Sequence, residues 1–340
     1  MIASDRVGSE LDACLASLAA QEAAPPFEVL VVSASEPARR DDLLVGWIRM
    51  EDRNPAARRN RGVDFAAGRL LAFIDDDARA APGWLARAQA TAARAPLFGG
   101  LDLLPPGSSY SERVSDLLLA TPGIGSGIPA HERAPHGGPV RAPSDLALCN
   151  FVVERALFDR LGGFDESLGY IGEDTDFVRR AMEAGVVPEL DPGLVVFHRR
   201  RPFPGPFLAQ RWRYRVKTGR LFAGNRPGLP RKKIGVFLAA GGAAGAASLY
   251  FGRKFWAPAA AVYAAATWTL SFPIWRRDRS LAPVVPGAFF LHHANYWVAT
   301  AAGIATALAS RKGKAGPGAM PVPAATAGSR ASNALPSHPR

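Results

Sequence analysis

Short apolar runs alternate with amphipathic stretches over the first hundred residues of the chain. Residues 27–32 and 70–74 are continuous apolar runs of strand length, a pattern typical of parallel strands that are buried on both faces. Helices are predicted from leucine spacing, from composition or from a preceding proline over residues 11–21, 54–67 and 83–94. This order of strands and helices predicts an α/β fold with a mainly parallel sheet.

The last third of the chain has a different pattern, with three long apolar segments. Residues 234–251 and 255–275 carry no charged side chain, and residues 284–310 are interrupted only by His292 and His293. Because these lengths match the thickness of a bilayer core, we predict two to three membrane helices. Two alternatives stay open: the first segment, rich in Ala and Gly, is a buried helix of a soluble protein, or the third segment lies in the membrane interface.

Basic clusters flank the apolar segments. Residues 231–233 precede the first segment and residues 276–279 follow the second, so the positive-inside rule favours the cytoplasm for both clusters. Residues 1–12 lack the apolar run of a signal peptide. We therefore predict a multi-pass protein of the inner (plasma) membrane whose N-terminal body is cytoplasmic. Residues 311–340, rich in Gly, Pro, Ala and Ser, predict a disordered tail.

The net charge of +11 is unevenly distributed along the 340 residues. Residues 1–198 hold 19 Lys and Arg against 29 Asp and Glu, whereas residues 199–233 hold 12 basic residues and no acid. A basic neck between an acidic body and apolar helices is explained by attraction to an anionic membrane, and we predict no nucleic-acid partner. Cys14 and Cys149 provide neither a disulfide framework nor a metal cluster.

A long loop over residues 121–145 is rich in Gly and Pro. Loops of this length in compact domains are usually functional lids or disordered segments. The two histidines of this loop, His131 and His136, are expected to be exposed to solvent.

Three adjacent carboxylates, Asp75, Asp76 and Asp77, follow the strand predicted over 70–74. Because side chains alternate along extended backbone, Asp75 and Asp77 are expected on one side and Asp76 on the other. Neighbouring carboxylates repel one another, and a hard cation such as Mg²⁺ or Mn²⁺ relieves that repulsion. The carboxyl end of a strand in an open α/β sheet is also where ligands bind. The alternative is a solvated turn or a helix N-cap.

Two further clusters carry candidate chemistry. Glu173 and Asp174 stand at the expected start of a helix, where a carboxylate serves either as a general base or as a partner of the helix dipole. His198 ends an apolar run, and a neutral imidazole there could complete a metal site with Asp77. Three arginines follow it as candidate diphosphate ligands or as attraction for anionic lipid: Arg199, Arg200 and Arg201.

Together these residues resemble the family 2 glycosyltransferases, which have the GT-A fold. The resemblance covers residues 1–225 and is carried by AARRNRGVDFAAGRLLAFIDDDARAAPGWL, LGGFDESLGYIGEDTDFVRRAMEAG and VVFHRR, in that order. It implies inverting transfer of a sugar from a nucleotide sugar to a hydroxyl group. We accordingly divide the chain into a GT-A domain over 1–225, a basic neck with membrane helices over 226–310, and the tail over 311–340.

The resemblance assigns roles on the donor side of the site. Asp75 and Asp77 match the DXD motif, which binds the nucleotide diphosphate through a divalent metal, with Asp76 between them. Arg59 and Asn60 match a helix start that lies against the nucleotide, and Arg200 is our candidate ligand of the diphosphate. These residues imply a nucleotide-sugar donor and either Mg²⁺ or Mn²⁺ as cofactor.

Further roles concern catalysis and the acceptor. Asp174 matches the catalytic base, and Glu173 is its neighbour in the motif. His198 matches a histidine that is a metal ligand in some members of the family. A turn that shapes the acceptor side is matched by Gly163, Phe164 and Asp165.

The sequence departs from the family pattern in three places. Only residues 1–6 precede the first predicted helix, so the first strand looks truncated. Residues 33–35 read Ser-Ala-Ser where the family usually has acids that contact the base. Residues 210–213 read Gln-Arg-Trp-Arg, which differs in spacing from the Gln-x-x-Arg-Trp motif of processive members. We interpret this segment as an interfacial amphipathic neck.

Two functions of different classes follow from these features. The first is metal-dependent sugar transfer to a lipid-linked or glycan acceptor at the membrane, in the synthesis of envelope polysaccharide or glycolipid. The second is a membrane scaffold of a polysaccharide assembly with weakened catalysis, suggested by the short first strand and the missing acids. Metal-dependent turnover of a nucleotide sugar distinguishes the two.

Overall fold

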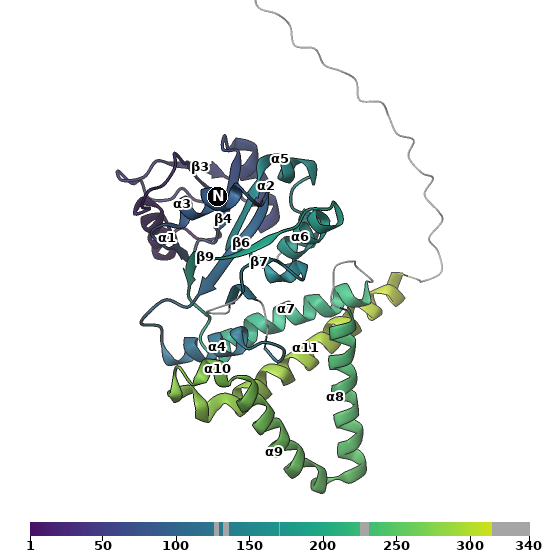
Figure 1. Cartoon of the computed structure of the whole chain (residues 1–340). Coiled ribbons are helices and arrows are strands. Elements are labelled where there is room, and N and C mark those ends of the chain that lie inside the picture. Colours follow the sequence, from purple (N-terminus) through teal and green to yellow (C-terminus); the bar gives the residue numbers. More distant parts are fainter. Residues whose placement is uncertain (126–128, 132–135, 170, 225–230, 315–340) are drawn as a thin grey trace, which may run out of the picture.

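The computed structural model describes residues 1–125, 129–131, 136–169, 171–224 and 231–314. These residues form an α/β body and, below it in Figure 1, a helical region. The two parts meet along helices α7 (Gly205–Ala223) and α11 (Val285–Lys314), which run side by side beneath the body.

The N-terminal strands form a small parallel sheet. β1 (Ile2–Ala3), β2 (Val29–Ser33) and β3 (Val45–Arg49) pair in that order. The Met1 backbone continues this sheet onto β4 (Leu70–Ile74), because its carbonyl accepts from Ile74 N at 3.2 Å. The helices predicted here are confirmed within a few residues as α1 (Ser9–Ala19), α2 (Pro55–Phe65) and α3 (Trp84–Ala92).

The second sheet is mixed, in the order β4-β8-β6-β9-β5, with β7 at the side of β9. Its strands are β5 (Ala78–Ala80), β6 (Leu97–Leu103), β7 (Gly138–Pro139), β8 (Asn150–Glu154) and β9 (Glu189–His198). β8 runs antiparallel to both β4 and β6, and only β6 and β9 are parallel. The prediction of a mainly parallel sheet is therefore wrong for this half, because buried apolar runs do not encode strand direction.

A cluster of phenylalanines holds the second sheet against its helices. The rings lie 5.2 to 6.3 Å apart and belong to Phe73, Phe151, Phe158, Phe164 and Phe177. They connect β4 and β8 with α5 (Arg155–Arg160) and α6 (Glu173–Glu183). Phe164 and Phe177 belong to stretches that carry the family resemblance, so this part of the core positions the chemistry described below.

The long loop over 121–145 contains two single turns of 3-10 helix, η1 (Pro129–His131) and η2 (Pro143–Asp145), with β7 between them. Residues 126–128 and 132–135 lie outside the described part, so the lid prediction stays a prediction. His136 is exposed as expected, whereas His131 is not.

The helical region packs onto the body through α4 (Tyr110–Ala120). Arg113 of α4 pairs with Asp278 at 2.7 Å, and the apolar face of α4 contacts α7, α11 and the 3-10 helix η4 (Arg279–Val284). Two glycines bring α7 and α11 close together. A Cβ atom added to Gly219 would lie 2.2 Å from Thr300 O, and one added to Gly303 would lie 2.1 Å from Val216 O.

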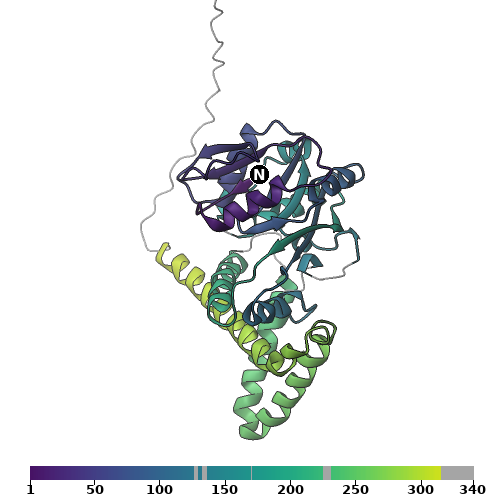
Figure 2. The same cartoon turned by 90° about the vertical axis from the view of Figure 1, so that its left-hand side faces the viewer.

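The remaining helices form a hairpin that projects away from the body (Figures 1 and 2). It consists of α8 (Arg231–Phe251) and α9 (Arg253–Leu270), followed by the short α10 (Phe272–Trp275). Of the described helices, α8 alone is long and apolar enough to cross a membrane, over Ile234–Phe251. One candidate by length and composition leaves the prediction of two to three membrane helices a prediction.

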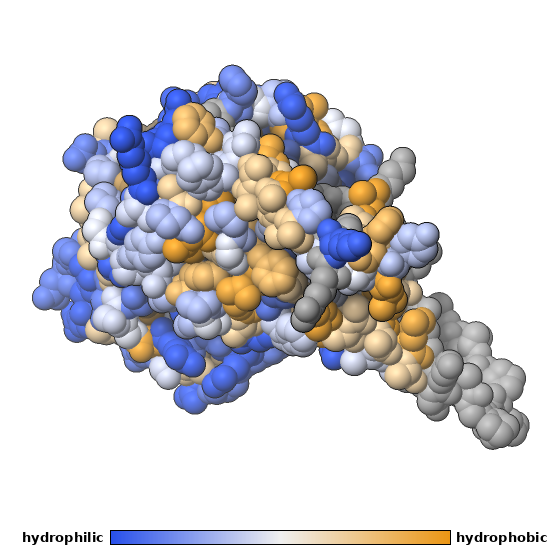
Figure 3. Space-filling view, turned by 90° about the horizontal axis from the view of Figure 1, so that it is seen from below, coloured by the Kyte–Doolittle hydropathy of each residue, from blue (hydrophilic) through white to orange (hydrophobic). Residues whose placement is uncertain are grey.

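Large hydrophobic side chains are exposed on the helical region, and Figure 3 shows apolar side chains gathered on the face seen from below. Examples are Leu249, Tyr250, Val262, Phe290 and Val298. Such a surface marks a site of interaction with an apolar partner. α11 continues to Lys314, beyond the boundary predicted at 310, and residues 315–340 of the predicted tail lie outside the described residues.

Candidate functional site

The three carboxylates after β4 have different partners. Asp75 Oδ1 accepts a hydrogen bond from Arg59 Nη2 at 2.9 Å, and Asp77 Oδ1 lies 3.0 Å from His198 Nε2. Asp76 Oδ2 instead accepts from Ser4 Oγ at 2.6 Å, and burial raises the pKa of Asp76 to about 6. The expected alternation is thus observed, and it separates Asp76 from the other two.

His198 lies between two carboxylates. β9 pairs with β5 so that His198 stands opposite Ala78, next to Asp77. On its other side, His198 Nδ1 lies 3.6 Å from Asp102 Oδ2. Burial opposes the charged ring, but Asp102 and Asp77 raise the pKa of His198 well above its usual range. The same negative field that favours a proton on the ring favours a metal cation beside it.

Asp102 is a functional residue that sequence analysis missed. It lies near the end of β6 and is buried, yet it contacts His198, Arg200 and His131, whose Nδ1 is 3.3 Å from Asp102 Oδ2. Burial would raise the pKa of Asp102, but Arg200 and His198 hold it well below the usual range. The expectation that His131 is exposed is wrong, because this carboxylate draws it inward. The sequence contained one signal for Asp102, namely a charged residue inside the apolar run of β6.

The donor set fits a hard divalent cation. Ligand atoms of Asp75, His198 and Cys149 lie within 4.8 Å of one another, and Asp77 contacts His198. Two carboxylates and an imidazole suit Mg²⁺ or Mn²⁺. Cys149 does not suit them, because burial raises the pKa of its thiol and a neutral thiol is a poor ligand for a hard ion. His198 Nδ1 is buried without a hydrogen-bond partner and faces Asp102, as a metal-ligating histidine usually faces its orienting carboxylate.

Arg59 connects the aspartate cluster with the second carboxylate motif. Gly172, at φ +95°, precedes α6, and the first residue of that helix is Glu173. Glu173 Oε1 accepts from Arg59 Nη1 at 3.0 Å, while the other end of the same guanidinium holds Asp75. Arg59 is thus placed as a positioning residue between the two motifs, with both of its charged partners supplied by the protein.

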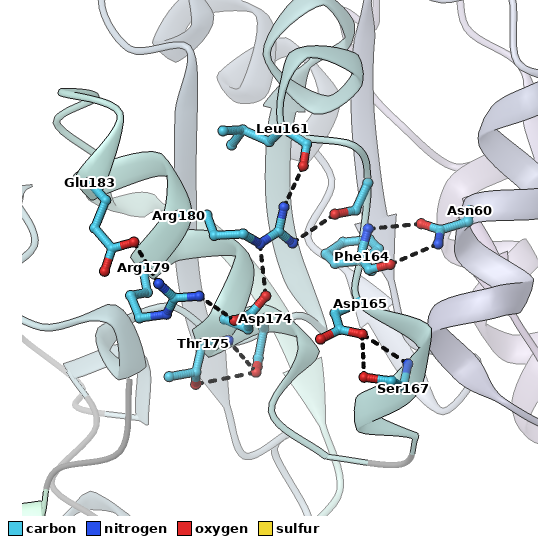
Figure 4. A network of polar contacts seen from close by, with 12 residues as sticks. Asn60, Leu161, Phe164, Asp165, Ser167, Asp174, Thr175, Arg179, Arg180 and Glu183 are labelled. Carbon is cyan, nitrogen blue, oxygen red and sulfur yellow. Dashed lines mark hydrogen bonds and ion pairs between the residues drawn. The ribbon is translucent and has the colours of Figure 1, made fainter. Parts of the chain in front are cut away.

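Asp174 is the more accessible of the two carboxylates that begin α6. Glu173 is buried on Arg59, whereas Asp174 is partly exposed and accepts from Thr175 N at 2.6 Å (Figure 4). Burial raises the pKa of both groups, and the charge of Asp174 raises that of Glu173 further. A raised pKa brings a carboxylate closer to the range in which a general base works best at neutral pH. With this geometry Asp174 stays the predicted base, and Glu173 is held by Arg59.

The turn over residues 162–166 is fixed by Asn60. The Asn60 side chain accepts from Phe164 N and donates to Phe164 O, both at 2.9 Å (Figure 4). A Cβ atom added to Gly163, at φ +71°, would lie 2.8 Å from Asn60 Oδ1. The predicted nucleotide contact of Asn60 does not fit this arrangement, because both of its polar atoms hold the turn. Phe164 is buried and Asp165 accepts from Ser167 N, so both shape the turn from within.

The three arginines after β9 are used differently. Arg200 is buried and donates to Asp102 Oδ2 at 2.8 Å and to Asp116 Oδ1 at 3.0 Å. The predicted diphosphate contact of Arg200 does not fit, because its guanidinium is already bound to two carboxylates. Arg199 pairs with Glu112, and Arg201, with a side chain 60% exposed, lies 3.6 Å from Asp77. Arg201 is therefore the arginine available beside the aspartates.

Helix α7 approaches the site from the side of the helical region. Lys217 Nζ donates to the backbone carbonyls of Leu168 and Ile171, just before α6. Burial raises the pKa of Tyr214, and the carboxylates Asp75, Asp174 and Glu173 add to this shift. Tyr214 is therefore near enough to these carboxylates for their charges to act on it, and the neck predicted as an interfacial helix also borders the site.

Comparisons with known proteins agree with this geometry. Residues 2–100 match the model of the family described as Glycosyl transferase family 2. Among proteins of curated function, none matches the chain significantly. A mannosyltransferase from Pyrobaculum calidifontis, PcManGT, in complex with GDP-Man and Mn²⁺ shares the fold at a TM-score of 0.50 and 20% identity, over 89% of this chain and 85% of that chain.

Two further solved structures are similar at lower scores. S. aureus TarS 1–349 in complex with UDP has 16% identity and a TM-score of 0.43, over 92% of this chain and 90% of that chain. GalNAc-T7 with UDP, GalNAc and Mn²⁺ has 17% identity and a TM-score of 0.44, over 64% and 47%. Residues 2–100 are therefore similar to the family 2 glycosyltransferases, and the chain shares the fold of the mannosyltransferase.

Proposed function

We propose that the protein transfers a sugar from a nucleotide sugar to a hydroxyl group, with a divalent metal held by Asp75, Asp77 and His198. One observation carries this proposal. Arg59 contacts Asp75 at 2.9 Å and Glu173 at 3.0 Å, so the metal-binding and base motifs, far apart in the sequence, share one site. A folding role alone explains each motif separately, but it does not explain their convergence around one guanidinium.

The residues suit a direct displacement at the anomeric carbon. Asp174 takes the proton of the acceptor hydroxyl as that oxygen attacks, and the nucleoside diphosphate leaves from the opposite face. A divalent metal, when bound, neutralises the negative charge that develops on this leaving group. Arg201 adds positive charge beside Asp77. Direct displacement with one base, and with cations that hold the leaving diphosphate, inverts the configuration at the anomeric carbon. A retaining hydrolase instead uses two carboxylates that flank the glycosidic bond.

The acceptor we propose is a lipid-linked hydroxyl compound at the cytoplasmic face of the inner membrane. This is supported by the apolar helix α8, by the exposed hydrophobic side chains around it and by the basic residues 231–233 at its N-terminal end. The position of α7 between the carboxylates and the helical region also supports it. The alternative acceptor is a soluble glycan. The complete set of carboxylates and histidine favours an enzyme over the scaffold considered from the sequence.

The test is a donor screen on membranes that contain the full-length protein. Labelled nucleotide sugars, starting with GDP-mannose because PcManGT was solved with it, are supplied with Mn²⁺ or Mg²⁺. We expect label in the lipid extract, lost on chelation and in Asp77→Ala and Asp174→Asn. Label only in soluble glycan assigns the other acceptor class. Wild-type protein that turns over no donor in the presence of metal contradicts the enzyme and supports the scaffold.

A further inference from the structure

Buried polar atoms without a partner gather where α7 packs on α11. On α7 these are Arg211 Nε and Arg215 Nε, and on α11 they are His292 Nδ1 and Asn295 Oδ1. Nearly all buried polar groups in native proteins have a hydrogen-bond partner. A cluster of unpartnered groups beside a candidate active site therefore indicates that a bound molecule supplies the partners.

The two arginines also have no counter-charge. Within the described parts of the chain, neither guanidinium has a carboxylate within ion-pair distance. Arg211 lies over the rings of Phe207 and Tyr214, at 5.7 and 4.8 Å from their centroids, and Arg215 lies over Tyr296 at 4.1 Å. These rings orient the guanidinium planes but accept few of their N–H groups. Both arginines are partly buried, and a cation withdrawn from water without an anionic partner is unfavourable unless a ligand neutralises it.

Burial lowers the pKa of Arg211 to about 10, and it lowers the pKa of Arg215 as well. Arg211 therefore stays charged at neutral pH. Because Arg211 keeps its proton, its positive charge remains, and an anion is still needed to neutralise it.

The arginines are one helical turn apart, so both lie on one side of α7. Tyr214, between them in the sequence, lies close enough to Asp75 and Asp174 for their charges to raise its pKa, and Lys217 in the next turn anchors α7 to the loop before α6. Because α7 runs beneath the body (Figure 1) and is tied to that loop, the arginine pair on α7 lies near the edge of the site, on the side of the helical region. The carboxylates already have cations of their own, namely Arg59, His198 and Arg201.

We propose that Arg211 and Arg215 form an oxyanion site for a phosphate group of a substrate, an inference that rests on the transferase function proposed above. Two guanidinium forks on one helix face match the several oxygens of a phosphate. The group has two possible sources, a phosphate on the lipid-linked acceptor or the diphosphate of the donor. The location on the helical side of the carboxylates favours the acceptor, because the metal ligands lie on the body side.

The test measures binding to the full-length protein in detergent. Farnesyl phosphate is the probe for a lipid phosphate, farnesol is its uncharged control, and GDP or UDP with Mn²⁺ is the probe for the donor. We expect Arg211→Met and Arg215→Met each to weaken farnesyl phosphate binding roughly ten- to hundredfold, the range for a lost charged hydrogen bond, and to leave farnesol unaffected. Arg213→Met is the matched control, since Arg213 is exposed on the same helix and should change nothing.

Each remaining result has a defined meaning. A loss confined to GDP or UDP supports the oxyanion site and assigns it to the donor. Unchanged binding of both probes in both variants overturns the proposal. Arg211→Lys and Arg215→Lys, which keep the charge but not the fork, provide folded variants if the Met variants are unstable, and they should still weaken binding. Wild type that binds no nucleotide with Mn²⁺ contradicts the transferase function, while the farnesyl phosphate measurement still decides this site.

Discussion

Arg200 and Arg211 are arginines on the same stretch of chain with opposite surroundings, the first buried and the second partly buried. Arg200 donates to Asp102 and Asp116, and these carboxylates raise its pKa despite burial. Arg211 has aromatic rings around it and no carboxylate within ion-pair distance among the described residues, and burial lowers its pKa to about 10. The charge of Arg200 is therefore neutralised within the folded protein, whereas the charge of Arg211 is neutralised by none of the described residues.

The difference follows the two sides of the site. On the body side, Arg59, Arg200 and His198 are all paired with carboxylates, and the pairs hold the metal-binding and base motifs in place. On the helical side, the charges of Arg211 and Arg215 have no partner among the described residues. We infer that the body side is preorganised, whereas the helical side is completed by substrate.

The largest effect is expected at the base. Asp174→Asn should reduce sugar transfer roughly 10²- to 10⁴-fold, the usual contribution of a general base, because an amide cannot take the proton of the acceptor. Binding of GDP or UDP with Mn²⁺ should be unchanged. Glu183→Gln is the control, since this carboxylate is exposed at the other end of α6. A transfer rate that stays within a few fold of wild type would remove Asp174 from the mechanism.

Two matched substitutions test the difference between Arg200 and Arg211. Arg200→Met leaves Asp116 as an uncompensated buried charge and Asp102 with only its two histidine neighbours, so it should lower the free energy of unfolding by about 3–5 kcal/mol. Arg211→Met removes a cation that has no ion pair, so it should be neutral or stabilising. Thermal or denaturant unfolding of the two full-length variants in detergent checks this. Equal destabilisation by both would show that Arg211 has a structural partner after all.

A substitution of Asp102 tests whether this carboxylate orients His198 on the body side of the site. Asp102→Asn keeps the size of the side chain but weakens its hold on His198, so the affinity for Mn²⁺ should fall roughly 10- to 100-fold, as for other orienting partners of metal ligands. Asp116→Asn is the control, because Asp116 contacts Arg200 without contacting His198. Mn²⁺ titration of the folded protein distinguishes the two variants, and equal affinities would mean that Asp102 does not orient the histidine.

The smallest effect concerns the packing of α7 on α11. Gly303→Ala places a methyl group against Val216 O, which should separate the helices and lower the free energy of unfolding by roughly 1–3 kcal/mol. Gly245→Ala is the control, because nothing lies within 4 Å of the added methyl group. If the helices separate, farnesyl phosphate binding should also weaken, since Arg211 and Arg215 lie on this pair. An unfolding midpoint as high as that of Gly245→Ala would contradict the close approach.

The residues that sequence analysis could identify are those with a local signature. The aspartates after β4, the pair at the start of α6 and the histidine at the end of β9 each end or begin an element, so their place in the fold follows from the pattern. The partners of these residues could not be predicted in the same way. Asp102, Arg200 and Asn60 act through contacts between distant segments, and only packing determines them.

The pattern of apolar and polar residues also did not predict the direction of the strands or the role of the neck. β8 is as apolar as a parallel strand, yet it pairs antiparallel on both sides. Basic and aromatic residues on α7 indicated a membrane surface, and the pattern contained no sign that Lys217 of this helix holds the loop before α6. Charge counts locate positive residues in the sequence, but they do not show which of them have a partner.

The most direct test of the metal-dependent transferase is a measurement of bound Mn²⁺ by electron paramagnetic resonance, with and without GDP or UDP. Wild type should bind Mn²⁺ more tightly when nucleotide is present, because the diphosphate shares the ion. Asp77→Asn and His198→Gln should lose this binding, whereas Asp174→Asn should retain it. Mn²⁺ and nucleotide binding that is equal in all four proteins would contradict the assignment of Asp75, Asp77 and His198 as the metal site.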